Sequence, residues 1–367
     1  MELTKSYRNF LASVVLTASC ILSPPGYSCT GIQLKANDGS YVNGRTVEFG
    51  MALDLSALVI PRNYQLKGTL PDGTTNGLAY TTKYAAMGGS AFNEPAIVDG
   101  INEKGLSVGM FYFPGYASYT ALTAQNKSHA LSPTEFPNWI LTQFATVSEV
   151  KAALKSVVIV PTTPKGWPGL PPFHYVVYDK AGNSIAIEPV NGELKVHDNP
   201  LGVMTNSPTF DWHMTNLINY MNLTPDNTTT KTVDNVQLKQ FGEGNGLHGL
   251  PGDFTPPSRF VRAAIFASSA IPVNNADQAV LQAFHILNQF DIPVGSVRTV
   301  MPNQTIPEFT LATTVKDPQN LNYYFRTYDD QTIKMISLSK FDLNSKMLKF
   351  VSMKGNQPVV DVSMAAK

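Results

Sequence analysis

The sequence predicts an α+β protein in which pairs of helices cover the outer faces of antiparallel sheets. Segments with strand-like alternation begin the chain, recur in its middle and end it, and two regions with helical spacing separate them. Strands and paired helices in this order form antiparallel sheets with helices on their outer faces. No long linker or internal repeat interrupts the 367 residues, so we expect a single domain over residues 29–367.

The domain begins with a predicted β-hairpin. Residues 30–35 and 41–49 alternate apolar and polar side chains, and residues 37–40 between them contain an Asp-Gly pair. An Asp-Gly turn between two such runs is a strong hairpin signal. Residues 96–113 predict a second hairpin, whereas residues 68–93 are rich in Gly and Thr and are expected to form a loop.

A capping box predicts the first helix. Ser132 and Glu135 are three residues apart, a proline lies between them, and the helix is expected to continue through Phe144. A second helix, capped by Ser148, is expected to end near residue 157. Further helices are expected at residues 212–221, 258–270 and 275–290, and strands at residues 173–178, 184–189, 310–315, 323–328, 332–337 and 348–353.

Residues 1–28 have the three parts of a secretory signal peptide. Lys5 and Arg8 form a positive start, residues 10–22 are an almost uncharged apolar run, and small residues precede a cut between Ser28 and Cys29. The apolar run is too short to cross a bilayer, which needs about 20 residues. We therefore expect an exported protein, periplasmic or secreted.

A competing interpretation takes residues 17–20 as a lipoprotein box. It would retain Cys20 as a lipidated terminus and leave Cys29 nine residues inside the chain. The box lacks the usual Leu at its first position, so the ordinary signal peptide is favoured.

Cysteine usage points to a functional thiol. The chain has two cysteines, and Cys20 leaves with the signal peptide. Cys29 then becomes the first residue, with its thiol, of pKa about 8.5, next to a free α-amine of pKa about 8. Such a pair is a nucleophile with its own base, and it needs no separate histidine.

Composition argues against several other classes. Lys+Arg and Asp+Glu number 27 each without a basic run, so nucleic acid is not an expected partner. The six histidines are scattered without metal-ligand spacing, no phosphate-binding loop is present, and no apolar stretch after residue 28 is long enough to enter a membrane. Neither a metal nor another cofactor is expected.

An ordered set of motifs resembles the choloylglycine hydrolase and penicillin V acylase family. The matching motifs are residues 29–31, 44–46, 60–63, 98–106, 113–117, 203–208, 250–253 and 258–260. They cover essentially all of the expected mature chain. The resemblance implies an N-terminal-nucleophile hydrolase with an αββα sandwich, a small-molecule N-acyl amide substrate with a linear, non-peptide amide bond, and a homotetramer.

The resemblance also implies roles for residues of the first hairpin. Cys29 is the expected nucleophile. Arg45, which the hairpin turns back toward Cys29, is expected to favour the thiolate. Glu48 is expected to accept a hydrogen bond from the α-amine. The family usually has Asp at that position, so an extra methylene must be accommodated here.

The remaining implied residues lie later in the chain. The side-chain amide of Asn206 and the backbone N–H of Tyr112 are the expected donors to the oxyanion, and Arg259 matches the family's second arginine. Arg262, one turn on, is expected to be structural.

The function we expect is that of an exported N-terminal-cysteine amidohydrolase that works through a thioester. Candidate substrates are conjugated bile salts, penicillin V and N-acyl homoserine lactones. Tyr112 resembles the penicillin V acylase side of the family, since bile salt hydrolases more often carry Asn there. The alternatives are an N-acyl homoserine lactone acylase of the same fold and an inactive exported binding paralogue.

Overall fold

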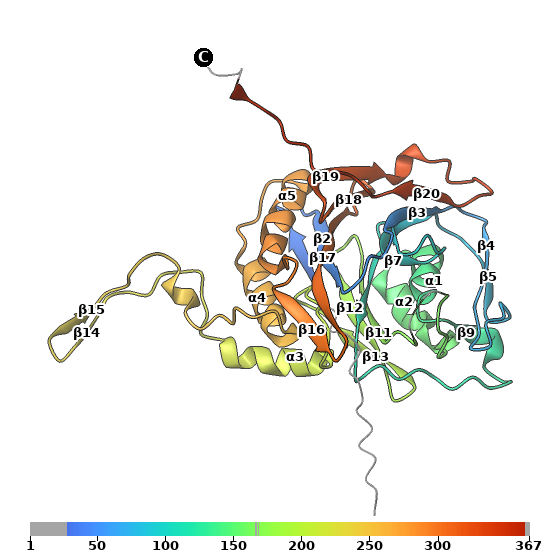
Figure 1. Cartoon of the computed structure of the whole chain (residues 1–367), viewed down its shortest axis with the longest axis horizontal. Coiled ribbons are helices and arrows are strands. Elements are labelled where there is room, and N and C mark those ends of the chain that lie inside the picture. Colours follow the sequence, from blue (N-terminus) through green and yellow to red (C-terminus); the bar gives the residue numbers. More distant parts are fainter. Residues whose placement is uncertain (1–27, 166, 168, 364–367) are drawn as a thin grey trace, which may run out of the picture.

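Two large antiparallel sheets pack face to face in the part of the chain that the computed structural model describes, residues 28–165, 167 and 169–363. The predicted signal peptide lies outside these residues except for Ser28. Helices cover both outer faces, which gives four layers (Figure 1). The predicted αββα arrangement is confirmed.

The first sheet has the strand order β1-β2-β17-β18-β19, and β16 pairs with one end of β17. Its strands are β1 (Cys29–Lys35), β2 (Tyr41–Phe49), β16 (Val297–Met301), β17 (Gln304–Asp317), β18 (Asn322–Thr327) and β19 (Asp330–Ser337). Helices α4 (Pro256–Ser269) and α5 (Ala276–Leu287) pack on its outer face. The side chain of Asn275 caps α5 by accepting a hydrogen bond from the Gln278 N–H, as the sequence predicts.

The second sheet has the strand order β13-β12-β11-β8-β7-β6-β3-β20. Its strands are β3 (Ser56–Ile60), β6 (Ala86–Ser90), β7 (Ile97–Asn102), β8 (Ser107–Tyr112), β11 (Phe173–Tyr178), β12 (Ser184–Val190), β13 (Glu193–Asp198) and β20 (Lys349–Ser352). Helices α1 (Phe136–Gln143) and α2 (Val147–Ala153) lie on the outer side of this sheet. The cap of α2 is Thr146, whose side chain accepts from the Glu149 N–H, so the prediction of Ser148 as the cap is wrong.

The predicted loop over residues 68–93 is correct for residues 68–78 and wrong for the rest, which contains β5 (Ala79–Thr81) and the buried strand β6. A Cβ atom on Gly88 would lie 2.2 Å from the carbonyl oxygen of Asp99, and one on Gly100 would lie 2.5 Å from that of Met87. Glycine is therefore needed here because β6 and β7 approach closely. Glycine at position 88 therefore marks a tight strand pair and not a loop.

A buried ion pair joins the two sheets. Lys316 on β17 places its Nζ 2.5 Å from Asp99 Oδ1 on β7. Thr314 and Tyr323 donate hydrogen bonds to the other carboxylate oxygen. Because these groups come from opposite sheets, they fix how the sheets face each other, and a buried charge left without its partner is costly.

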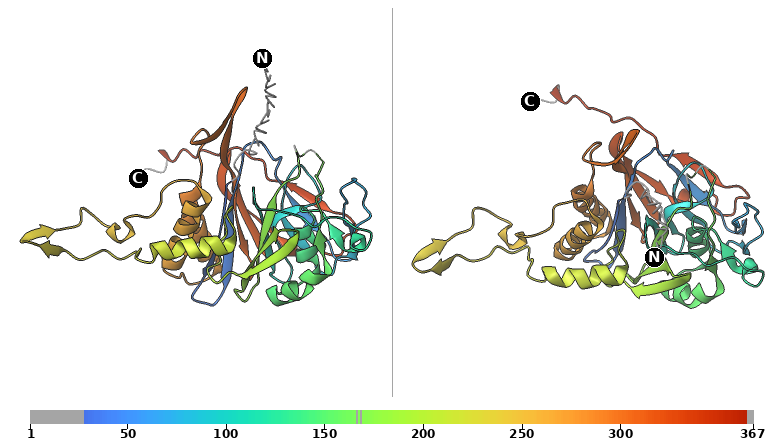
Figure 2. Two further views of the ribbon diagram at one scale, coloured as in Figure 1. Left: turned by 90° about the horizontal axis from the view of Figure 1, so that it is seen from below. Right: turned by 60° about the horizontal axis from the view of Figure 1, so that its bottom comes forward.

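A long arm projects from the body between helix α3 (Phe210–Leu217) and α4. It carries the short hairpin of β14 (Lys231–Val233) and β15 (Val236–Leu238), and it stays clear of the body in both views of Figure 2. The sequence analysis did not anticipate it.

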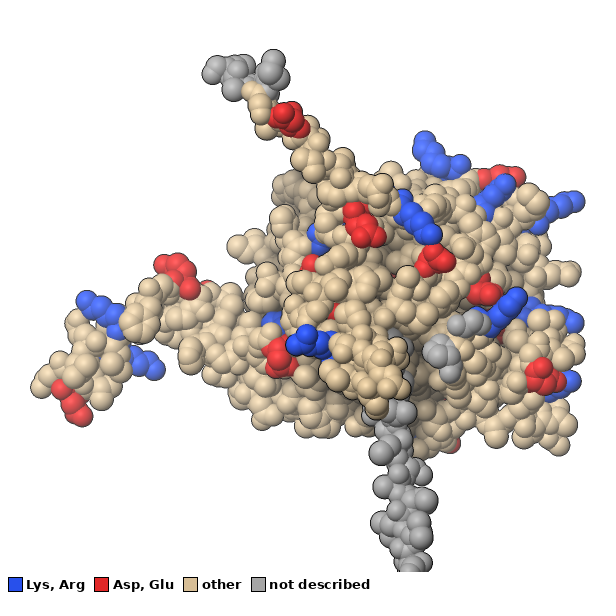
Figure 3. All heavy atoms as spheres, in the orientation of Figure 1, with Lys and Arg blue, Asp and Glu red and all other residues tan. Residues whose placement is uncertain are grey.

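Acidic and basic side chains are interspersed on the face shown in Figure 3, without a patch of one sign. Within the described ranges, helices long and apolar enough to cross a membrane are absent.

Candidate active site

Cys29 is the first residue of β1, and its side chain is only 5% exposed. Ser28 precedes it in this structure, so its nitrogen is a peptide N–H at the position that a free α-amine would take. That N–H donates to Asn206 Oδ1 at 2.8 Å. The expected nucleophile is therefore anchored at its own backbone nitrogen.

The first hairpin brings the predicted residues of β2 to Cys29. Cys29 pairs with Val47, and Gly31 pairs with Arg45. A cavity of about 40 Å³ is lined by Cys29, Arg45, Glu48 and Tyr112, together with apolar side chains. Four of the six predicted site residues therefore line one space.

Arg45 is a buried cation held by main-chain oxygens. Its Nη1 donates to the Met110 carbonyl at 2.5 Å and its Nε to the Thr46 carbonyl at 3.1 Å. The guanidinium lies 3.9 Å from the centre of the Phe111 ring. Burial raises the pKa of the Cys29 thiol, and the positive charge of Arg45 opposes that rise. Arg45 can thus favour the thiolate, as expected.

Glu48 is a buried carboxyl group with an incomplete set of partners. Its Oε1 accepts a hydrogen bond from Thr310 Oγ1 on β17 at 3.1 Å, whereas Oε2 has no hydrogen-bond partner among the described residues. Burial raises the pKa of Glu48 to about 8. A cation placed at Oε2 would restore the charged form.

Asn206 and Arg259 form a clamp around the start of β1. Asn206 Oδ1 accepts from Arg259 Nη2 at 2.7 Å in addition to the Cys29 N–H, and Asn206 Nδ2 donates to the Tyr112 carbonyl at 2.7 Å. Arg259 also donates to the Cys29 carbonyl and to Thr30 Oγ1. Because an amide nitrogen carries two hydrogens, Asn206 retains a second donor for an oxyanion.

The segment that carries Asn206 is aligned by backbone bonds to β1. Gly31 N donates to the Met204 carbonyl at 2.7 Å, and Met204 N donates back to the Gly31 carbonyl at 3.1 Å. Arg262 instead donates to the carbonyls of Pro251 and Asp253, in keeping with the structural role predicted for it.

The sequence analysis missed Glu308. This residue on β17 is buried, its Oε1 has no hydrogen-bond partner among the described residues, and its carboxylate accepts hydrogen bonds from Ser28. Burial raises its pKa. It lies near Glu48, whose pKa its negative charge raises further. The only signal in the sequence was that Glu308 lies two residues before an expected strand. That position does not reveal its contact with Ser28, which is distant in the chain.

Over the described ranges, groups of three or more His, Cys, Asp or Glu side chains placed to hold a metal ion are absent.

Comparison with known proteins identifies the family. The model for linear amide C–N hydrolases of the choloylglycine hydrolase family matches residues 29–351. This chain belongs to the choloylglycine hydrolase family. The bile salt hydrolase/transferase of Clostridium perfringens is 35% identical over 323 residues, which are 88% of this chain and 95% of that protein.

Solved structures agree with this assignment. A mutant of the conjugated bile acid hydrolase from Clostridium perfringens superposes with a TM-score of 0.81 at 33% identity, covering 91% of this chain and 100% of the other. The penicillin V acylase from Agrobacterium tumefaciens superposes with a TM-score of 0.70 at 25% identity, covering 90% of this chain and 93% of the other. The chain therefore has the N-terminal-nucleophile hydrolase fold and is a hydrolase of carbon–nitrogen bonds in linear amides.

Proposed function

We propose that the chain is an exported amidohydrolase in which Cys29, freed by removal of residues 1–28, attacks the carbonyl carbon of an N-acyl amide. The sulfur–carbon bond forms, the carbon–nitrogen bond breaks, and the thiol proton passes by way of the α-amine to the leaving nitrogen. Water then hydrolyses the thioester and restores the thiol. The observation that carries this proposal is the cavity shared by Cys29, Arg45, Glu48 and Tyr112.

The cavity lining favours an apolar acyl group. Val47, Phe49, Leu53, Met110 and Phe173 line the space next to Cys29. A second cavity of about 480 Å³ has Ala91, Val98 and Trp167 in common with it. Cavities of this size hold small-molecule ligands.

We propose conjugated bile salts as the first substrate class, on the strength of the 35% identity to a bile salt hydrolase/transferase. Penicillin V is second, supported by Tyr112 and by the penicillin V acylase structure. The test is a panel of glycocholate, taurocholate, penicillin V and N-acyl homoserine lactones, with amine release as the readout. Preference for the lactones would instead support a lactone acylase.

The nucleophile is tested with Cys29→Ser. A serine hydroxyl is a far poorer nucleophile near neutral pH, so the variant should fold but lose most of its turnover. Iodoacetamide should label one site in the wild-type enzyme and abolish activity. Normal hydrolysis by the variant contradicts the proposal, and an intact wild type without activity on any substrate supports an inactive binding paralogue.

Export and the cut are tested by N-terminal sequencing of the protein recovered outside the cytoplasm. Cys29 as first residue supports the proposal. Cys20 as first residue, or an uncut chain, contradicts it.

We further propose that copies of the chain assemble into a homotetramer through the arm. Its support is the apolar side chains that the arm exposes, which are Val233, Val236, Leu238 and Phe241. Light scattering on wild type and on a Val236→Asp/Phe241→Ser variant tests this. An unchanged mass for the variant contradicts a role for the arm.

A further inference from the structure

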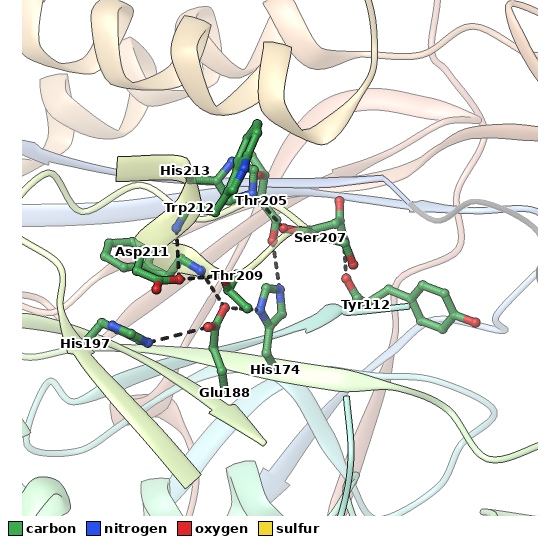
Figure 4. Close-up of polar contacts among 12 residues, drawn as sticks. Tyr112, His174, Glu188, His197, Thr205, Ser207, Thr209, Asp211, Trp212 and His213 are labelled. Atoms are coloured by element: carbon green, nitrogen blue, oxygen red, sulfur yellow. Dashed lines mark hydrogen bonds and ion pairs between the residues drawn. The ribbon is translucent and has the colours of Figure 1, made fainter. Parts of the chain in front are cut away.

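Two buried histidines hold the peptide groups on either side of Asn206. His174 on β11 places its Nε2 3.0 Å from the Thr205 carbonyl oxygen, and His213 on α3 places its Nε2 2.9 Å from the Asn206 carbonyl oxygen (Figure 4). These carbonyls belong to the peptide planes before and after the Asn206 Cα. Together the histidines therefore fix the direction in which the Asn206 side chain leaves the backbone.

The hydrogen bonds of His174 require one proton at Nε2 and a second proton between Nδ1 and Glu188. A carbonyl oxygen only accepts, so Nε2 must carry a hydrogen. On the other side, Nδ1 faces Glu188 Oε1 at 3.1 Å, and that oxygen already accepts from the Phe210 N–H at 3.0 Å. A neutral imidazole has only one N–H, so a further proton must lie between His174 and Glu188.

Burial makes this proton structurally important. His174 is 1% exposed and Glu188 is 0% exposed, and the imidazole stacks on the Phe113 ring at 4.1 Å between centroids. An isolated charge in a buried site has a high desolvation cost, whereas a hydrogen-bonded pair of opposite charges offsets part of that cost.

Other titratable groups also face the pair. His197 on β13 places its Nε2 3.6 Å from the second oxygen of Glu188, and its side chain is 28% exposed. His213 is kept neutral near pH 7 because burial lowers its pKa to about 4, and the charge of Arg259 acts in the same direction. Asp211 interacts with His197 at the outer side.

We propose that Glu188 and His174 form a buried carboxylate–imidazolium pair that positions Asn206 as the oxyanion donor. Both are positioning residues, since they act through the Thr205 carbonyl. The catalytic consequence rests on the proposed function, in which Asn206 stabilises the oxyanion, but the charge state of the pair does not.

Glu188→Gln tests the pair because no arrangement of glutamine keeps all three hydrogen bonds without leaving the buried imidazolium unpaired. If the glutamine oxygen faces the Phe210 N–H, His174 is either an imidazolium without a negative partner or a neutral ring whose Nε2 has no hydrogen for the Thr205 carbonyl. If the glutamine NH₂ group takes that place, it faces the Phe210 N–H, and two donors then oppose each other. His174→Gln leaves Glu188 without its cation.

We expect each variant to lower kcat by about 10-fold or more, but by no more than the roughly 10²–10³-fold loss that follows removal of a whole oxyanion donor. KM should change less than about twofold, because transition-state stabilisation is what is lost. The double variant should lose no more than either single one, since the two residues act as a unit. His197→Gln, which alters a neighbour of the same carboxylate, is the matched control. A loss no larger than that of His197→Gln, or fully additive losses, would overturn the positioning role.

The charge state is tested in the wild type by NMR with ¹⁵N-labelled histidine at pH 8, where ordinary histidines are neutral. One imidazolium with two protonated nitrogens that persists in His197→Gln supports the pair. Six neutral rings in the wild type, or an imidazolium that is lost in His197→Gln, overturn it. This measurement needs no turnover. An absence of activity on the substrate panel would therefore reject the proposed function and leave the pair to be decided by NMR.

Discussion

Glu48 stands where the family resemblance expects aspartate, and its burial makes its charge state important. Only one of its oxygens has a hydrogen-bond partner among the described residues, and its pKa is raised to about 8. The α-ammonium of a freed Cys29 is the cation that would favour the carboxylate. Under the proposed function, the charge of this longer side chain therefore depends on the removal of residues 1–28.

Glu48→Gln tests that role at the level of one charge. We expect kcat to fall by at least about 10-fold, because hydrogen bonds to charged groups are worth about 1.5–3 kcal/mol. Glu48→Asp is the companion variant. Its activity will fall if the backbone has adapted to the longer side chain, and will be retained otherwise. If both variants have the same pH–rate profile as the wild-type enzyme, Glu48 has no part in the reaction.

Glu308→Gln tests the second buried carboxyl group. Its negative charge raises the pKa of Glu48, so its removal should move the acid limb of the pH–rate profile to lower pH. Glu193→Gln, on the exposed surface of β13, is the control. Superimposable profiles for Glu308→Gln and wild type would remove Glu308 from the site.

At the scale of elements, local signals predicted the part of the site that lies within one hairpin. The Asp-Gly turn was enough to bring Arg45 and Glu48 back to Cys29. The partner of Glu48 on β17 is 262 residues away, and nothing local specifies that pairing. Glu308 was missed for this reason, and the contact of His174 with Glu188 was missed because both residues appeared only as parts of expected strands. The resemblance, and not periodicity, supplied Asn206 and Arg259.

Trp167 belongs to this scale because it lies in the connection before β11 and lines both cavities. Its ring contacts those of Phe49 and Phe173, with centroids 5.7 and 5.6 Å away. Trp167→Ala should join the two spaces and raise kcat/KM for bulky relative to small acyl groups by about 10-fold or more. The measurement is the ratio of kcat/KM for glycocholate to kcat/KM for penicillin V. Trp212→Ala on α3 is the control. An unchanged ratio would mean that Trp167 does not bound the acyl site.

At the scale of the whole molecule, the raised pKa of Glu48 makes stability depend on pH. In the folded chain Glu48 keeps its proton up to about pH 8, whereas in the unfolded chain it releases the proton near its ordinary pKa of 4.5. The free energy of unfolding should therefore fall as pH rises from about 4.5 to about 8. This holds for the form that retains Ser28.

A chain with Ala before Cys29 separates this effect from the mature state. It should lose activity, since the α-amine is no longer next to the thiol, and it should show the fall in stability between pH 5 and pH 8 in denaturant titrations. The mature chain should show a smaller fall because its ammonium favours the carboxylate. The extended Glu48→Gln chain, which lacks the titrating group, is the control. Equal falls for the extended and mature chains, or full activity of the extended chain, contradict the role of the amine.

The pairing of β2 with β17 also sets an order in time. Cys29, the proposed nucleophile, is made near the start of translation, whereas Glu308 and Thr310 leave the ribosome near its end. Until then the edge of β2 that pairs with β17 has no neighbouring strand, and the first sheet consists of β1 and β2 alone. A chain that ends before β17 therefore lacks the strand that supplies Thr310 to Glu48. We expect such a truncated chain to have no hydrolase activity.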